Sequence, residues 1–145
     1  MLFIDANIWC YYFDARHPEH ERVKTFMRRA LLSERLAVNT IVVIEVAHYL
    51  NRNLRGDEAQ RRTENLLALG NLHLHDFDKE QLLKSLDVLN RYSSSHGLGG
   101  RDATIISTVK SQGIGTLVTH DGALGHVARL ESVEVVDPVK GLEEG

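Results

Sequence analysis

The chain lacks several features that mark particular classes of protein. It has one cysteine, Cys10, among its 145 residues, so an intrachain disulfide framework is impossible and a reducing cytoplasm is the expected compartment. It also lacks a surplus of positive charge. The formal net charge is -3 at pH 7, so any nucleic-acid site must rest on a local basic patch. These shortages exclude a disulfide-stapled secreted module and a globally basic nucleic-acid binder.

Long hydrophobic runs are missing as well. The apolar N-terminal stretch through Phe13 carries Asp5, lacks a basic region before it and is too short to span a bilayer. No repeat, low-complexity tract or long linker divides the sequence. With 43% hydrophobic residues the chain can bury an ordinary core, so we expect one domain over residues 1–145 that makes no membrane contact.

Short apolar runs alternate with helical patterns along the whole sequence. We predict strands at 2–5, 36–39, 71–74, 116–119 and 133–136. We predict helices at 6–13, 18–32, 41–54, 58–69, 78–92, 102–112 and 122–130, with Thr40 capping the third and a flexible loop at 93–100. Strands that alternate with helices predict a three-layer α/β/α fold, in which helices cover both faces of a mainly parallel sheet.

Acidic residues stand where four apolar runs stop or turn over: Asp5, Glu45, Asp102 and Asp121. Asp5 closes the first predicted strand, and Asp121 follows the fourth after one residue. If those strands are parallel neighbours, both carboxylates lie at the strands' carboxyl ends, where open α/β sheets bind ligands. The pattern therefore predicts a shared acidic pocket.

Each acid also has a structural explanation. Taken alone, Asp102 and Asp121 are best explained as helix N-caps, because each precedes a helical run. Glu45 interrupts an apolar helical run, which suggests that it faces a cleft. Asp5 ends a buried strand, where a carboxylate is seldom buried unless it is paired or bound to a metal ion.

The four carboxylates together point to metal-dependent chemistry. Gathered in one pocket, they repel one another unless a cation lies among them. An all-oxygen site favours Mg²⁺ or Mn²⁺ over Zn²⁺, for which the chain offers neither a cysteine pair nor a His-x-x-x-His helix. Such a site supports attack of an activated water on a phosphodiester, which leaves a 5′-phosphate and a 3′-hydroxyl. The alternative is histidine chemistry, for which His48 and His120 are candidates.

Four segments together resemble the PIN domain, and specifically the VapC-type ribonuclease toxins: 3–7, 40–45, 101–103 and 117–121. The resemblance covers nearly the whole chain and implies a parallel α/β/α fold, dependence on Mg²⁺ or Mn²⁺, and endonucleolytic cleavage of RNA. By position, it implies that Asp5, Glu45, Asp102 and Asp121 form the catalytic metal site, with Asn7 and Thr119 supporting it. Arg101 beside Asp102 departs from the usual pattern, as does Gly-Ala-Leu after Asp121, where a Phe is frequent at the last position.

The resemblance also implies partners. These are RNA, a second copy in a homodimer, and a small antitoxin with a segment that inserts near the acidic pocket. The aromatic run after Asp5, residues 9 and 11–13, is a candidate for that groove, with core packing as the alternative for at least two members. Arg52, Arg55 and Arg101 are candidate RNA contacts, together with Arg61, Arg62 and Lys110. A solvated face with salt bridges to Asp57, Glu58 and Glu64 explains several of these cations equally well.

Two other functions are compatible with parts of the pattern. A phosphatase of the haloacid dehalogenase type also has an aspartate after its first strand, but it requires Asp-x-Asp, and the third position here is Asn7. A non-catalytic PIN module that binds RNA or a protein is expected to have lost one or more of the acids. All four are present, which favours an active nuclease.

Overall fold

The computed structural model describes residues 1–140, which alternate between strands and helices as predicted. The strands are β1 (Leu2–Ile4), β2 (Leu36–Asn39), β3 (Leu72–His75), β4 (Thr116–Val118) and β5 (Glu134–Val136). The helices are α1 (Ala6–Phe13), α2 (His20–Ser33), α3 (Thr40–Asn53), α4 (Gly56–Leu67), α5 (Lys79–His96), α6 (Gly100–Ser111) and α7 (Gly122–Leu130). No helix among these residues is long and apolar enough to cross a membrane.

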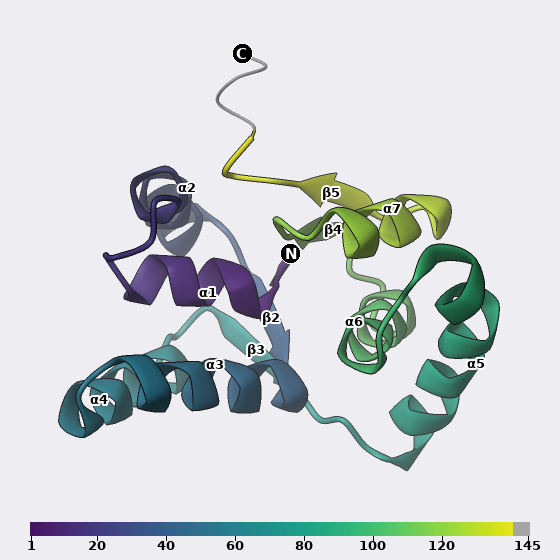
Figure 1. Cartoon of the computed structure of the whole chain (residues 1–145), viewed down its shortest axis with the longest axis horizontal. Coiled ribbons are helices and arrows are strands. Elements are labelled where there is room, and N and C mark those ends of the chain that lie inside the picture. The colour runs from purple at the N-terminus through teal and green to yellow at the C-terminus, as the bar shows by residue number, and fades with distance from the viewer. Residues whose placement is uncertain (141–145) are drawn as a thin grey trace.

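The strands form one sheet in the order β3-β2-β1-β4-β5, and every pairing is parallel. Helices α1 to α4 gather on one side of the sheet, and α5 to α7 lie on the other (Figure 1). This confirms the predicted α/β fold with a parallel sheet. The chain first steps from β1 out to β3 and then returns to place β4 on the other side of β1. The strand order therefore reverses between β1 and β4, and the carboxyl ends of the strands at such a reversal are where folds of this kind bind ligands.

The core lies on both faces of the sheet because helices cover both. Phe3, Ile4 and Val38, on the central strands, are fully buried. Trp9 is also fully buried, and Phe13 stacks on it with ring centroids 5.8 Å apart. For these two aromatic residues the groove interpretation is wrong, since they pack in the core instead.

Several predicted boundaries differ from the observed ones by a few residues, and three of these differences have an identifiable physical cause. Asn39, not Thr40, caps α3, because its buried side chain accepts a hydrogen bond from the Val42 backbone N–H at 2.8 Å. The predicted loop at 93–100 is helical through His96, and α5 ends only where Gly97 adopts a left-handed φ of 67°. Serines lower helix propensity without breaking a helix, whereas glycine in the left-handed region ends one.

The third boundary bears on the site. Helix α6 begins at Gly100 with Gly99 as its N-cap, so Asp102 lies in the first turn and does not cap the helix. The capping explanation of Asp102 is therefore wrong.

Candidate active site

Asp5 and Asp121 follow β1 and β4, which are adjacent parallel strands, as the sequence pattern required. Asp5 is 7% exposed, and both of its oxygens have donors. Its Oδ1 accepts a hydrogen bond from the Ala6 backbone N–H at 2.7 Å, and its Oδ2 accepts one from the Thr119 hydroxyl at 2.7 Å. The Thr119 hydroxyl oxygen also accepts the Asp121 N–H at 3.0 Å. Thr119 therefore connects the two acidic positions.

Asp121 also has a structural role. It is the N-cap of α7, and its Oδ1 accepts a hydrogen bond from the Leu124 N–H at 3.0 Å. The capping explanation is thus confirmed for Asp121, whose residue is exposed to solvent. Capping occupies only one lone pair of the carboxylate, so the group keeps acceptor capacity for a further ligand.

The other two acids come from helices on opposite sides of the sheet. Glu45 lies on α3, and Asp102 lies in the first turn of α6. Glu45 Oε2 accepts a hydrogen bond from Arg101 Nη1 at 2.8 Å, which joins these two helices. The side chain of Glu45 is 20% exposed and that of Arg101 is 72% exposed. Arg101, the departure noted in the sequence, therefore already neutralises one acid of the set.

The pKa values of Asp5, Glu45 and Asp102 are raised by burial and, to a smaller extent, by the charges of neighbouring acids of the set. Burial raises the pKa of Asp5 to about 6, against the hydrogen bonds from Thr119 and Ala6, and the charges of Glu45 and Asp121 raise it further. Burial also raises the pKa of Asp102 to about 6, with added contributions from Asp121 and Asp5. The pKa of Glu45 is raised by burial, lowered by Arg101 and raised again by Asp102. The predicted acidic cluster is thus one electrostatic unit.

The donor set fits a hard divalent cation in its chemistry. Carboxylate oxygens are the ligands that Mg²⁺ and Mn²⁺ prefer, and Asn7, two residues after Asp5, has a buried Oδ1 without a hydrogen-bond partner among residues 1–140. Bound positive charge would also favour the ionised forms of Asp5 and Asp102, whose pKa values are raised by burial and, to a smaller extent, by neighbouring carboxylates. Among residues 1–140, however, no three acidic, histidine or cysteine side chains already enclose a possible ion position. Donors from Thr119 and Arg101 hold two of the carboxylates instead.

A cleft of about 660 Å³ adjoins this cluster and shares Asn7, Glu45 and Arg101 with it. Its walls follow α1 and α3, which pack against each other. Residues one helical turn apart line it on each side, so the cleft extends along both helices. Towards the C-terminal ends of α1 and α3, the residues that line the cleft include Tyr11, His17, Tyr49, Arg52 and Asn53.

The cations predicted to contact RNA separate into two groups. Arg52 and Arg101 line the cleft. Arg55 does not: its side chain is 87% exposed and lies 3.9 Å from Asp57. Arg62 lies 3.6 Å from Glu58, and Lys110 donates a hydrogen bond to the Glu131 carbonyl at 2.7 Å. The salt-bridge explanation is therefore confirmed for Arg55 and Arg62, whereas Arg52 and Arg101 are the cations of the cleft.

The two candidate histidines also differ. His48 lines the cleft and is exposed. His120 Nδ1 lies 2.9 Å from Asp137 Oδ2, and this hydrogen bond connects the segment after β4 to the residue after β5.

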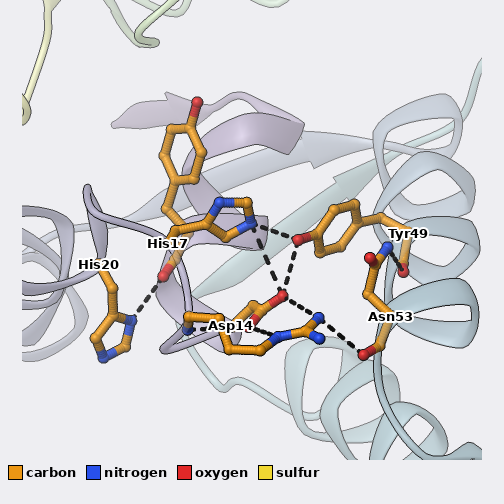
Figure 2. Close-up of polar contacts among 7 residues, drawn as sticks. Asp14, His17, His20, Tyr49 and Asn53 are labelled. Atoms are coloured by element: carbon orange, nitrogen blue, oxygen red, sulfur yellow. Dashed lines mark hydrogen bonds and ion pairs between the residues drawn. The ribbon is translucent and has the colours of Figure 1, made fainter.

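Figure 2 shows a polar network around Asp14. This network was not predicted from the sequence. The Asp14 side chain is 2% exposed and accepts hydrogen bonds from Arg16 Nε at 2.9 Å, Arg16 Nη2 at 2.8 Å and the Tyr49 hydroxyl at 2.8 Å. His17 Nε2 contacts the same hydroxyl. The Arg16 hydrogen bond holds the pKa of Asp14 well below its usual range. The only local signal was a carboxylate directly after an apolar run, because Tyr49 is remote in the sequence.

The comparisons with a family model and with solved structures agree with each other. A model of the PIN domain family matches residues 2–130. Curated proteins give no significant match. Among solved structures, VapC20 of Mycobacterium tuberculosis, a toxin that cleaves the sarcin–ricin loop, matches with a TM-score of 0.74 and 19% identity, over 88% of this chain and 95% of its own.

Two solved complexes are similar as well. VapBC2 of Rickettsia felis, bound to a DNA fragment from its promoter, matches with a TM-score of 0.69 and 17% identity, over 94% of this chain and 98% of its own. FitAcB of Neisseria gonorrhoeae matches with a TM-score of 0.68 and 22% identity, over 95% and 98% of the two chains. At these identities the structural similarity establishes a shared fold.

Proposed function

The chain belongs to the PIN domain family, and on that premise we propose that it is a metal-dependent endoribonuclease, the toxin of a toxin–antitoxin pair. One observation carries the proposal. Carboxylates from four separate elements share one electrostatic field at the reversal point of the sheet. Carboxylates that are partly buried and close to one another disfavour their own ionised forms, and such groups are concentrated at functional sites. The similarity in fold to a toxin that cleaves the sarcin–ricin loop supports RNA as the substrate.

In this proposal Asp5, Glu45, Asp102 and Asp121 hold Mg²⁺ or Mn²⁺. When bound, the ion lowers the pKa of a water ligand and stabilises charge on the scissile phosphate. Asp5 is the central acid because it is the most buried of the four and has both oxygens oriented by donors. Its fixed orientation means that little conformational freedom is lost when a ligand arrives.

The supporting residues act on the carboxylates. The Thr119 hydroxyl donates to Asp5 and so favours its ionised form, against the burial that favours the neutral acid. Asn7 supports the site with an amide oxygen that accepts no hydrogen bond from residues 1–140 and is therefore available to accept one at the site. Arg101 orients Glu45 and supplies positive charge beside the phosphate position. Thr119, Asn7 and Arg101 thus support the four carboxylates.

The proposed partners follow from the same family. RNA is the substrate, and Arg52 and Arg101 are its contacts in the cleft. We include Arg55 only as a peripheral contact, because it lies outside the cleft. A second copy of the chain and a small antitoxin complete the assembly, as the complexes of similar fold suggest. The proposed location is the cytoplasm, in keeping with a single, buried, unpaired cysteine.

The deciding experiment measures cleavage and metal binding together. We expect the purified protein to cleave single-stranded or loop RNA in Mn²⁺ or Mg²⁺, to lose this activity in EDTA, and to bind Mn²⁺ in a calorimetric titration. Products should carry 5′-phosphates, because the attacking group is water. Full activity in EDTA would overturn the metal mechanism and favour histidine chemistry at His48 and His120.

A further inference from the structure

The acidic cluster accounts for only one part of the cleft. Among the residues that line the remainder are Tyr11, His17 and Tyr49, which have no part in the proposed metal site. They come from α1, from the segment after it and from α3. The network around Asp14 holds His17 and Tyr49 (Figure 2), and the Tyr11 ring packs against His17. Aromatic side chains beside the proposed nuclease site can stack against the base of a nucleotide.

The hydrogen-bond network determines which nitrogen of His17 carries a proton. Asp14 is ionised near neutral pH, so it accepts, and the Tyr49 hydroxyl donates its only hydrogen to Asp14 Oδ2. The Tyr49 oxygen can therefore only accept from His17 Nε2, which must carry the proton in that contact. Among residues 1–140, the hydrogen bond of the His17 ring is made by Nε2, and Nδ1 makes none. In the neutral ring this nitrogen is a hydrogen-bond acceptor.

These aromatic side chains are fixed before any ligand binds. Arg16 donates from Nη2 both to Asp14 and to the Asn53 carbonyl at 2.8 Å, so the segment between α1 and α2 is attached to the last turn of α3. The rings also pack on one another. Tyr11 and His17 meet edge to face with centroids 5.0 Å apart, and His17 and Tyr49 are tilted by 30° at 5.6 Å. Because these side chains are already ordered, a ligand that stacks on them loses little affinity to ordering.

The charge of the cleft also suits a nucleotide. Among the described residues that line it, Glu45 is the only acid, and Arg101 neutralises it. Arg52 lines the same cleft on an exposed turn of α3. A phosphate in the cleft thus faces the guanidinium group of Arg52, while the scissile phosphate next to it faces the acidic cluster.

We propose that this cleft binds one nucleotide of single-stranded RNA beside the scissile phosphate, with the base against His17 and its neighbouring tyrosines and the phosphate near Arg52. His17 Nδ1 contacts the edge of the base and thereby gives the enzyme a base preference at one position next to the cut. The inference rests on the proposed ribonuclease function and extends it to substrate selection. Histidine and tyrosine rings are common stacking partners for unpaired bases, which makes single-stranded RNA the substrate class.

The test compares two substitutions of the same histidine. His17→Ala removes the ring, and His17→Phe keeps an aromatic face but removes both nitrogens. His73→Ala is the matched control, because His73 is exposed on β3 and does not line the cleft. For each variant, kcat and KM are measured on a single-stranded RNA of mixed sequence in Mn²⁺, Mn²⁺ affinity is measured by calorimetry, and the cleavage products are sequenced.

We expect His17→Ala to raise KM on the order of tenfold, the usual effect of losing one base-stacking partner. Its kcat and Mn²⁺ affinity should match the wild type, because the interaction is made equally in the ground state and the transition state. His17→Phe should raise KM less but should lose the base preference next to the cut. His73→Ala should leave both KM and the base preference at their wild-type values.

The outcomes separate the two proposals. If the wild type cleaves RNA and binds Mn²⁺ while both His17 variants keep its KM and base preference, the nucleotide subsite is wrong and the ribonuclease proposal stands. If the wild type neither cleaves RNA nor binds Mn²⁺, the ribonuclease proposal fails and the subsite fails with it. If the His17 variants weaken only binding of a partner protein, the cleft is a protein-docking site and the inference is overturned.

Discussion

Asp102 is the residue that best distinguishes a functional acid from a structural one. It is not the N-cap of α6, and its side chain accepts no hydrogen bond among residues 1–140. Its raised pKa, about 6, means that the ionised form is unfavourable in the metal-free fold. A carboxylate that costs stability and has no structural partner is typical of a ligand-binding site.

Replacing Asp102 by Asn should therefore have opposite effects on function and stability. RNA cleavage and Mn²⁺ affinity should fall, whereas the metal-free protein should gain about 1 kcal/mol after allowance for solvent screening. The melting temperature in EDTA should then rise by roughly 3 to 5 °C, as measured by differential scanning fluorimetry. Asp87→Asn on the exposed face of α5 is the control and should change none of these quantities. Wild-type Mn²⁺ affinity in Asp102→Asn would remove Asp102 from the site.

Asp14 is the opposite kind of carboxylate. Its pKa is lowered, first by the hydrogen bond from Arg16, so its ionised form is favoured in the folded state. Replacing it by Asn should destabilise the fold by roughly 2 to 3 kcal/mol, because charge-assisted hydrogen bonds from a buried network are lost.

The same variant tests the pH dependence. A carboxylate with a lowered folded-state pKa stabilises the fold fully above its unfolded pKa of 3.8, and this stabilisation is lost progressively as the pH falls from that value through the folded-state pKa. Urea titrations from pH 6 down to pH 3 should therefore show that wild type loses more stability over this range than Asp14→Asn. Equal losses in the two proteins would mean that Asp14 does not stabilise the fold through its charge.

At the scale of elements, the junction between α5 and α6 positions Asp102. Helix α5 ends at Gly97, whose φ of 67° lies in the left-handed region, and α6 begins only three residues later at Gly100. A Cβ at Gly97 would meet no atom within 4 Å, so the effect of a substitution there is purely conformational.

We expect Gly97→Ala to lower stability by about 1 kcal/mol, because the left-handed conformation is unfavourable for residues with a Cβ. Cleavage should weaken with it if the start of α6 shifts. Gly70→Ala is the matched control, since Gly70 has equally open surroundings and no positive φ. Chemical denaturation of both variants measures the difference, and equal stability of the two would show that the α5 end does not require glycine.

At the scale of the whole molecule, metal binding and folding are coupled through the acidic cluster. Asp5 and Asp102 have pKa values of about 6 in the fold, against 3.8 for a free aspartate. Because folding favours their protonated forms, the metal-free protein should become more stable as the pH falls from about 7 towards 4. With saturating Mn²⁺ the trend should reverse, since ligands must be ionised to bind and the stabilisation by metal fades.

Melting curves measured between pH 7 and pH 5, in EDTA and in Mn²⁺, test this coupling. The acidic end of this range stays above the pH at which Asp14 begins to lose its stabilising charge. Opposite slopes in the two buffers are the expected result. Parallel slopes would show that the cluster does not bind the ion through these carboxylates.

The sequence by itself determined the alternation of strands and helices, the parallel sheet and the acids at the ends of β1 and β4. These features follow from local periodicity and from a resemblance carried by short segments. The sequence also indicated that Asp121 can cap a helix, which depends only on the following three residues.

Only the tertiary structure decided how those elements meet. The Tyr49 hydroxyl reaches Asp14 across 35 positions of sequence, and Arg101 reaches Glu45 across 56. No local pattern encodes such contacts, because they arise when helices from different parts of the chain pack against one another. The same packing buried Trp9 in the core and left His17 beside the cleft. The tertiary structure also decided where helix α5 ends. Residues 93–96 remain helical because the left-handed residue that ends the helix is Gly97. The serine-rich composition of this segment does not reveal that position.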